Sequence, residues 1–359
     1  MNIAFIQPHL LNIGGEQRVL LELASRFARM GYGVKIFTSN FDREKLSFDV
    51  SGLPIEICYG PMNVLGHLNM YMYYRSLLRC TRRAEAWGAD VLFLNTGYEW
   101  SPRLRKHTRL PILAYVHNVE RIRLEYGGIL SDSWTRNPAR DVVLVCCSNY
   151  AQSLLRDVLG QFESTVVHPG VDIQKFHHTG ADDGYLVCHG RFQRRKNQEL
   201  AIKAASGMRH SLFVTGSLEP KTSRLEYFDE LQQISRGYAN VRLMPNLSEH
   251  EVVGIVENCS LFLLPSKEDY FPLTCLEAMA AGKPVLGLRS GGLPETIAQV
   301  SAFLLCGEDP EEWKTKIESL MADSSQRRIL GKAARKVAEQ FSWDSTTKQI
   351  ERLMIEARN

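Results

Sequence analysis

Short, continuous apolar runs alternate with longer amphipathic segments, and this alternation constrains the fold more than any other feature of the chain. Strands that are apolar throughout are typical of parallel sheets covered by helices on both faces. The sequence therefore predicts an α/β fold of doubly wound, Rossmann-like parallel sheets. The first half contains the runs IAFIQ, GVKIFTS, IEICY, VLFLN, ILAYVH, VVLVCCS and TVVHP, and the second half contains YLVCHG, SLFVTG, VRLMPN, LFLLPS, PVLGL and AFLLC.

The alternation breaks once, at KFHHTGADDG, residues 175–184, which is polar, contains glycine and has no periodicity. A chain of 359 residues with 44% apolar residues is long enough for two domains with cores of their own. We therefore predict a first domain over residues 1–175 and a second over residues 184–341. Ligands of such sheets bind beyond the carboxyl ends of the strands, so we expect a site in a cleft between the domains.

Charge and cysteine content narrow the class of protein. The net charge of +3 is too small to indicate nucleic acid, although residues 1–160 hold 19 Lys and Arg against 14 Asp and Glu. The eight cysteines form no CxxC pair and no zinc-like cluster with histidine. We expect reduced, mostly buried thiols, no metal site, no nucleic-acid partner and a cytoplasmic location. NIAFI at the start indicates a strand rather than a signal peptide, and no apolar run has the roughly 18 residues of a membrane span.

A glycine pair, Gly14 and Gly15, follows the first predicted strand and opens a helix. Backbone amides and the helix dipole favour an anion there, although a tight turn explains the pair equally simply. The pattern is not GxGxxG, so it gives little support to a nicotinamide cofactor. His117 follows another predicted strand, where ligands bind, but a lone histidine is often structural.

A basic loop lies in LVCHGRFQRRKNQELAIKAA, between a predicted strand and a predicted helix. It contains Arg191, Arg194, Arg195 and Lys196. Basic groups at such a junction can neutralise a diphosphate. The alternative is a solvated basic turn.

The stretch SKEDYFPLTCLEAMAAGKPV places an acid inside an apolar helix. Pro272 suits the start of this helix, and Asp269 just before it is a candidate N-cap. Helical side chains tilt toward the N-terminus, so Glu277 leans toward the first turn, where the amides of Leu273 and Thr274 can hold phosphate oxygens. A carboxylate there is placed for ribose hydroxyls, or it pairs with a nearby Lys or Arg.

Taken together and in order, these stretches resemble the retaining glycosyltransferases of family 4, which have the GT-B fold. The resemblance spans nearly the whole chain. Its segments are GGEQRVLLELASRFARMGYGV for the glycine loop and helix, HPGVDIQKF near the hinge, GRFQRRKNQELAIKAA for phosphate binding, DYFPLTCLEAMAAGKPV for the E-x7-E element, SGGLPE after it, and FSWDSTTKQIERL for the terminal helix.

The resemblance implies that residues 184–341 bind a nucleotide-sugar donor. Arg191 and Lys196 would bind its diphosphate, Glu277 would bind its ribose, and the backbone at Leu273 and Thr274 would complete the phosphate cradle. The first domain would lie on the acceptor side and would be joined by a C-terminal helix over residues 343–359.

The resemblance also implies contacts with the transferred sugar. Asp269 would touch its hydroxyls, His117 would lie beside it near the reacting carbon, and Gly14 and Gly15 would let the first loop approach the donor phosphate and the acceptor. The sequence departs from the family at two places. Asp269 is one methylene shorter than the usual glutamate, and Glu16 follows the glycine pair where a small residue is common.

The activity implied is a metal-independent, retaining hexosyltransfer from a UDP- or GDP-sugar to an acceptor hydroxyl, with no cofactor besides this co-substrate. No covalent nucleophile stands out, so we expect front-face attack with the departing phosphate taking the proton. The product would belong to glycan, lipid-linked saccharide or glycolipid synthesis. The alternatives are a nucleotide-sugar-binding protein that has lost transfer through Asp269, a small-molecule glycosyltransferase, and an epimerase or phosphorylase of the same fold, although the lysine context for pyridoxal phosphate is missing.

Residues 62–83, MNVLGHLNMYMYYRSLLRCTRR, are basic and rich in aromatic residues and contain no acid. Such an amphipathic stretch can rest on an anionic membrane, which would favour a lipid-linked acceptor over a free sugar or small molecule. The alternative is a core helix with a solvated basic end.

Overall fold

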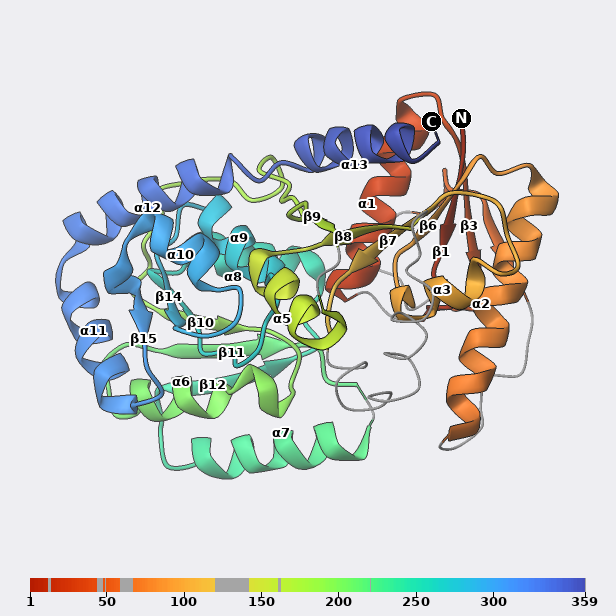
Figure 1. Ribbon diagram of the computed structural model, residues 1–359. Coiled ribbons are helices and arrows are strands. Elements are labelled where there is room, and N and C mark those ends of the chain that lie inside the picture. The colour runs from red at the N-terminus through yellow and green to blue at the C-terminus, as the bar shows by residue number, and fades with distance from the viewer. Residues whose placement is uncertain are drawn as a thin grey trace. The chain divides into compact units, whose positions relative to one another are not determined.

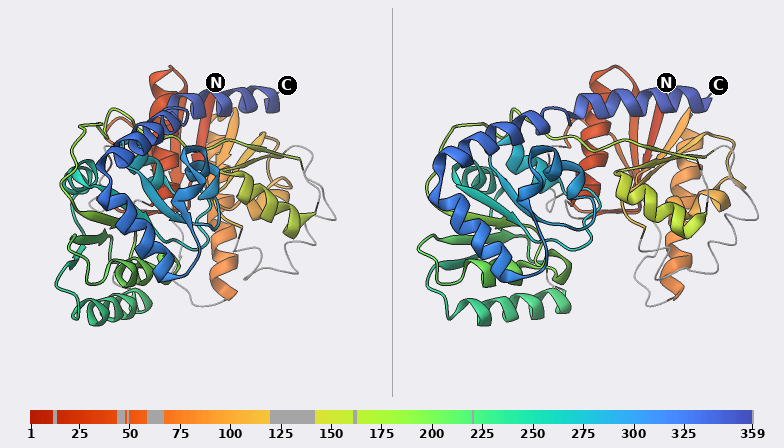
Figure 2. Two further views of the ribbon diagram at one scale, coloured as in Figure 1. Left: turned by 90° about the vertical axis from the view of Figure 1, so that its left-hand side faces the viewer. Right: turned by 60° about the vertical axis from the view of Figure 1, so that its left-hand side comes forward.

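The computed structural model of the protein describes residues 1–11, 14–43, 48, 50–58, 67–119, 142–160, 163–219 and 221–358. Contacts between residues divide the chain into two compact units. The first unit combines Met1–Pro169 with Trp343–Asn359, and the second is Gly170–Ser342. Helices lie on both faces of the main sheet in each unit (Figures 1 and 2).

The first unit contains a seven-stranded sheet, ordered β5-β3-β1-β6-β7-β8-β9, in which every pair is parallel. All seven predicted strands are confirmed. The strands are β1 (Asn2–Ile6), β3 (Gly33–Thr38), β5 (Ile55–Ile57), β6 (Val91–Leu94), β7 (Ile112–Val116), β8 (Val142–Cys146) and β9 (Ser164–Val166). A short parallel pair, β2 (His9–Leu10) with β4 (Asn40–Phe41), was not predicted.

Helices bury the faces of this sheet. In α1, Leu20, Leu23, Ala24 and Phe27 are fully buried at helical spacing. Ser148 is the N-cap of the helix after β8, because its hydroxyl accepts a hydrogen bond from the amide of Ala151 (3.0 Å). The helices are α1 (Gly15–Arg29), α2 (His67–Trp87), α3 (Ser101–Leu104), α5 (Asn149–Leu159) and α13 (Trp343–Arg358), with the 3₁₀ turn η1 (Tyr98–Trp100).

The last helix, α13, completes the first unit although it comes from the far end of the chain (Figure 1). Its Ile350 and Met354 are fully buried. Asp344 accepts a hydrogen bond from Arg26 of α1 (3.0 Å). The first unit therefore has a core built from both ends of the sequence.

The second unit contains a six-stranded parallel sheet, ordered β12-β11-β10-β13-β14-β15. Five of the six predicted strands are confirmed: β10 (Leu186–His189), β11 (Leu212–Gly216), β12 (Val241–Pro245), β13 (Leu261–Leu264) and β14 (Val285–Leu288). The sixth, AFLLC, is confirmed only for its last two residues, which form β15 (Leu305–Cys306), because the first three form a 3₁₀ turn. The helices are α6 (Gln198–Ala205), α7 (Thr222–Ser235), α8 (Glu249–Asn258), α9 (Leu273–Ala280), α10 (Pro294–Val300), α11 (Pro310–Ala322) and α12 (Ser324–Ala338), with 3₁₀ turns η3 (Arg194–Lys196) and η4 (Ala302–Leu304).

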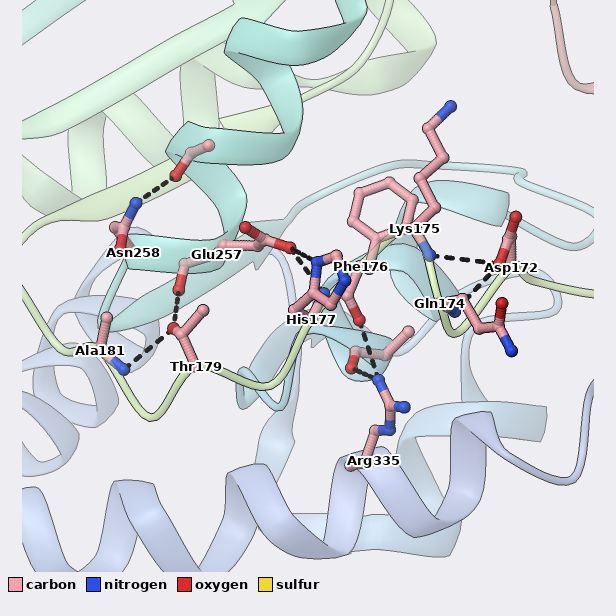
Figure 3. A network of polar contacts seen from close by, with 12 residues as sticks. Asp172, Gln174, Lys175, Phe176, His177, Thr179, Ala181, Glu257, Asn258 and Arg335 are labelled. Atoms are coloured by element: carbon pink, nitrogen blue, oxygen red, sulfur yellow. Dashed lines mark hydrogen bonds and ion pairs between the residues drawn. The ribbon is translucent and has the colours of Figure 1, made fainter.

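The polar segment 175–184 lies in the second unit, where side chains hold it along its length (Figure 3). Arg335 of α12 donates to the carbonyl of Phe176 (2.9 Å), and Glu257 of α8 accepts from the amide of His177 (2.6 Å). Further along, Lys283 donates to the carbonyl of Ala181 (2.5 Å). The two units divide between Pro169 and Gly170, ahead of this segment.

All eight cysteines are buried, as expected from the sequence. Across the ranges described above, no helix combines the length and hydropathy that a membrane span needs. The same ranges contain no group of three or more His, Cys, Asp or Glu side chains arranged to hold a metal ion.

Candidate functional site

A buried ion-pair cluster joins two loops at the carboxyl ends of β10 and β13, which are neighbouring strands. Asp269, 5% exposed, lies in the loop after β13. Its Oδ1 accepts from Arg195 Nη1 (2.6 Å) and its Oδ2 accepts from Lys196 Nζ (2.5 Å). The Lys267 amide also donates to the Arg195 carbonyl (2.8 Å). The basic loop is therefore tied to the acidic stretch by both side chains and backbone.

The local backbone conformation directs the side chains of Arg195 and Lys196 toward Asp269. Asn197 ends the 3₁₀ turn η3 in the left-handed region, with φ 53°. Within η3, Arg194 turns away to Glu230 (2.5 Å), whereas Arg195 and Lys196 turn to Asp269. Adjacent residues of this turn therefore pair with different acids, and only Arg195 and Lys196 belong to the cluster around Asp269.

The SGGLPE loop packs directly against the backbone of the acidic stretch. The Gly292 amide donates to the Asp269 carbonyl (2.7 Å). A Cβ at Gly292 would overlap the Tyr270 carbonyl, and one at Gly291, which has φ +61°, would overlap the Asp269 carbonyl. Only glycine permits this close approach, so the two glycines fix the position of Asp269.

The electrostatics of the cluster favour an ionised Asp269. Burial raises the pKa of the Asp269 carboxyl, but Lys196 and Arg195 more than offset this, so the pKa lies below its ordinary value. Burial lowers the pKa of Lys196, Asp269 opposes that shift, and the nearby charges of Arg195 and Arg191 add to it. The cations repel one another and share one buried carboxylate.

Arg191 lies at the edge of this cluster, with Nη1 3.9 Å from Glu219 Oε1 and its side chain 36% exposed. Buried Gln198 donates to the carbonyls of Gly190 (3.2 Å) and Arg191 (3.0 Å), which holds the start of the basic loop. Through Glu219 and Asp269 the described ion pairs join five cations to two carboxylates. The cations are Arg191, Arg195, Lys196, Lys221 and Arg224. This excess of positive charge suits an anionic ligand.

Helix α9 begins at Leu273 with Pro272 as its N-cap and has no side-chain cap. The prediction that Asp269 caps this helix is therefore wrong, because both of its oxygens accept from the basic loop. The first-turn amides of Leu273 and Thr274 have no acceptor within the helix. Glu277, 8% exposed, lies one turn further on.

In the first unit, polar side chains follow three adjacent strands, β1, β6 and β7. These side chains are Gln7, Asn95 and His117. Asn95 Nδ2 lies 2.7 Å from Gln7 Oε1, and Asn95 Oδ1 lies 3.0 Å from His117 Nε2. Glu16 in the first turn of α1 accepts from Asn118 (2.9 Å). Since Asn95 also donates to the Glu16 carbonyl (2.9 Å), the network links His117 to the first turn of α1.

Burial lowers the pKa of His117 to about 4, against the opposing effect of Glu16. The ring is therefore neutral at pH 7. At the glycine pair, the Gly14 amide donates to Gln17 Oε1 (3.0 Å), whereas Gly15 is exposed. One of the two amides expected to face a ligand is thus used by the helix itself.

Within the second unit, the structure brings Lys196 into contact with Asp269, with Arg191 nearby, and it places Leu273, Thr274 and Glu277 on α9. Within the first unit, it brings His117 to the helix that starts after Gly14. The functional roles of these residues remain predictions. The sequence names Arg195 within the basic loop but gives it no role of its own. Gln7 and Asn95 were not predicted, although each carries a readable signal, a polar residue directly after an apolar strand.

Two family models match the chain in succession and overlap at residues 172–175. Residues 13–175 match "Glycosyltransferase Family 4". Residues 172–337 match "Glycosyl transferases group 1". Together the two matches include every predicted site residue.

Curated relatives agree with this placement. A D-inositol 3-phosphate glycosyltransferase from Saccharomonospora viridis is 29% identical over 95% of this chain and 89% of its own length. The corresponding match in Salinispora tropica, also 29% identical, covers 52% of this chain and only 44% of that protein. The alpha-1,3/1,6-mannosyltransferase ALG2 of Rhizomucor pusillus is 22% identical over 99% of this chain and 92% of its own length.

Solved structures share the fold at low identity. Sucrose-phosphate synthase from Thermosynechococcus elongatus has a TM-score of 0.84 at 19% identity, covering 99% of this chain and 98% of that one. HepE of Anabaena, solved in complex with UDP-glucose, has a TM-score of 0.80 at 17% identity, covering 99% and 100%. The chain belongs to the family 4 glycosyltransferases and has their GT-B fold.

Proposed function

We propose that the protein transfers a hexose from a UDP- or GDP-sugar to an acceptor hydroxyl with retention at the anomeric carbon and without a metal ion. The observation that carries this proposal is the cluster of Arg191, Arg195, Lys196 and Asp269, with its excess of positive charge, in a chain of this family. The HepE complex with UDP-glucose supports a nucleotide sugar as the donor.

The donor diphosphate would bind between the basic loop and the start of α9. Lys196 and Arg191 would neutralise it, and the amides of Leu273 and Thr274 would donate to its oxygens. These groups are fixed before the ligand arrives, so they would stabilise charge that develops on the departing diphosphate. Glu277, one turn behind, would accept from the ribose hydroxyls.

Asp269 would hold the transferred sugar while staying ion-paired. Each carboxylate oxygen accepts more than one hydrogen bond, so the contacts with Arg195 and Lys196 leave capacity for a sugar hydroxyl. The shorter side chain of aspartate would keep that hydroxyl closer to the two cations than a glutamate would.

The names of the relatives suggest hydroxylated acceptors. The D-inositol 3-phosphate glycosyltransferases are named for a phosphorylated polyol, and the alpha-1,3/1,6-mannosyltransferase ALG2 is named for the linkages between sugars that it forms. We propose hydroxylated acceptors of this class, handled by the first unit around Gly14, Gly15 and His117.

We also propose a peripheral contact of α2 with anionic membranes. One face of this helix is core, with Leu77 and Cys80 fully buried, as the alternative prediction has it. The other face exposes Tyr71, and the guanidinium of Arg75 lies 5.7 Å from the Tyr71 ring centroid. Flotation with vesicles containing phosphatidylglycerol would test this. Absence of binding, or equal binding to neutral vesicles, would contradict it.

The proposed transfer is tested first by donor binding. Bound nucleotide sugar raises the free energy of unfolding by RT ln(1 + [L]/Kd), so a thermal-shift panel of UDP-, GDP- and ADP-sugars will identify the preferred base. Stabilisation without turnover of any sugar acceptor would instead support the alternative of a binding protein.

The second test replaces the proposed phosphate ligands. We expect Lys196→Ala or Arg191→Ala to reduce kcat/KM at least tenfold, because a charge-assisted hydrogen bond contributes about 1.5 to 3 kcal/mol. Lys203→Ala is the matched control, since Lys203 is half-exposed and its one ion pair among the described residues is with Glu199 in the preceding turn of the same helix. Near-normal transfer by both site variants would refute the assignment.

A further inference from the structure

A directional chain of hydrogen bonds ends at His117. Gln7 Nε2 donates to the backbone carbonyl of His9 (3.1 Å), and Gln7 Oε1 accepts from Asn95 Nδ2 (2.7 Å). The same Asn95 Nδ2 donates to the backbone carbonyl of Glu16 (2.9 Å). Asn95 Oδ1 then faces His117 Nε2 at 3.0 Å.

Two backbone carbonyls fix the direction of this chain. A carbonyl only accepts, so the group of Gln7 that faces His9 must be the NH₂. Its oxygen therefore faces Asn95, which must present its own NH₂. The carbonyl of Glu16 requires the same orientation of Asn95 independently. What remains for His117 is the Asn95 oxygen, and an oxygen that accepts requires a proton on His117 Nε2.

Burial makes the arrangement costly to reverse. Asn95 is fully buried, and Gln7 is 2% exposed. Flipping either amide would place an NH₂ against a donor or an oxygen against a carbonyl, and an unpaired buried polar group costs about 1 to 3 kcal/mol. The network therefore has one satisfied state.

We infer that Gln7 and Asn95 are positioning residues that hold His117 as the neutral Nε2–H tautomer, so that Nδ1 presents a lone pair to a hydroxyl of the sugar substrate. Among the residues the structure describes, Nδ1 has no hydrogen-bond partner of its own. The identity of that hydroxyl rests on the proposed function, but the tautomer does not. His117 is then a hydrogen-bond acceptor for substrate and not a cation or a proton donor at neutral pH.

The groups around the ring support the neutral form. Among the described residues, the carboxylate of Glu16 in α1 is the charged group that acts on the ring, and it favours protonation. From the strands, Tyr115 packs against the ring at 4.8 Å between centroids, and the Cys147 thiol contacts the His117 carbonyl at 3.7 Å. The neutral amide of Asn95 faces Nε2, and the neutral amide of Asn118 donates to Glu16. Burial outweighs Glu16 and lowers the pKa to about 4.

The test is nitrogen-15 NMR of the full chain labelled at histidine, with His117 assigned by its absence in His117→Gln. Long-range couplings to the ring protons distinguish the protonated from the unprotonated nitrogen. We expect Nε2 to carry the proton at pH 7 and the ring to stay neutral down to about pH 5. A proton on Nδ1, or a protonated ring at pH 6, would overturn the inference.

A substitution tests the link to Asn95. Asn95→Asp places a carboxylate against Nε2, which favours the imidazolium, so the His117 titration should move up by at least one pH unit. Asn240→Asp is the matched control, because Asn240 Nδ2 also donates to two backbone carbonyls, those of Ala205 (2.8 Å) and His210 (3.0 Å). It should leave the His117 titration unchanged. An unchanged titration in Asn95→Asp would refute the link.

Addition of UDP-glucose or GDP-mannose tests the lone pair. A hydroxyl that donates to Nδ1 shifts the Nδ1 resonance, while Nε2 stays protonated. If a nucleotide sugar stabilises the protein but leaves the Nδ1 resonance unchanged, His117 does not accept a hydrogen bond from the substrate, and this part of the inference is overturned. If no nucleotide sugar stabilises the protein, the proposed function fails, and the couplings still decide the tautomer.

Discussion

At the scale of single residues, Asp269 holds the second unit's charged cluster together. Its two oxygens accept from Arg195 and Lys196 in a place where water is largely excluded. Because these two cations share one buried carboxylate, that carboxylate offsets part of the free-energy cost of removing their charges from water. The residue therefore links the stability of the fold to the electrostatics of the proposed site.

Replacing this acid should destabilise the protein. We expect Asp269→Asn to lower the free energy of unfolding by about 3 kcal/mol, because Lys196 and Arg195 then keep their charges without the counter-ion. Urea denaturation measures the change. Glu268→Gln, an exposed neighbour, is the control and should change stability by less than about 0.5 kcal/mol. Equal effects of the two variants would show that the ion pairs contribute nothing.

The same residue predicts a dependence on pH. Because the folded-state pKa of Asp269 lies below its ordinary value of 3.8, the stability it contributes is fully present above pH 3.8 and is lost as the pH falls through the folded pKa. The stability difference between the native protein and Asp269→Asn should stay constant from pH 8 to about pH 5. It should shrink only below the ordinary value. A difference that already declines at pH 6 would contradict this account.

At the scale of elements, the sequence predicted the strands but not the directions in which the side chains of the loops point. Buried parallel strands are apolar throughout, so each one is visible as a run of letters. The pair β2 and β4 is two residues long on each side and has no period to detect. Within the RRK run, the turn ending at Asn197 sends Arg194 outward and Arg195 inward. That choice depends on backbone conformation, which three adjacent basic letters do not encode.

The candidate site was predictable in the same uneven way. Lys196 and Asp269 were selected from separate motifs, and the structure joins them directly. The network of Gln7, Asn95 and His117 depends on which strands are neighbours, and strand order is not written in any local pattern. The segment 175–184 has the composition of a linker, yet long-range hydrogen bonds hold it in the second unit.

The SGGLPE loop, residues 290–295, gives a prediction at this scale. Gly292→Ala should destabilise the second unit by at least about 2 kcal/mol, because its Cβ would overlap the Tyr270 carbonyl and push the acidic stretch away. Gly254→Ala, in the interior of α8, is the matched control. Nothing lies within 4 Å of its Cβ position, so alanine should stabilise that helix by up to about 1 kcal/mol. Thermal denaturation of both variants should give shifts of opposite sign.

At the scale of the whole molecule, the chain leaves the first unit, builds the second and returns as α13. The returning helix buries Ile350 and Met354 and contacts β7 and β8. The first unit therefore depends on residues that follow the second unit in sequence.

Truncating one buried side chain of α13 should reveal this dependence. We expect Ile350→Ala to cost about 2 to 4 kcal/mol, because the side chain is fully buried and leaves a cavity. Hydrogen exchange should speed up in β7 and β8 while the strands of the second unit keep their protection. Ile355→Ala on the same helix, where the side chain is 45% exposed, should have little effect. Uniform loss of protection in both sheets would contradict independent units.

The placement of α13 has a consequence for biosynthesis. A ribosome makes residues 1–169 first, but their core lacks Trp343–Arg358 until those residues have also been made. The second unit, Gly170–Ser342, is contiguous and can fold as soon as it has emerged. The nascent chain should therefore complete its later half before its earlier half. Until then, the apolar surface that α13 will cover is open to chaperones.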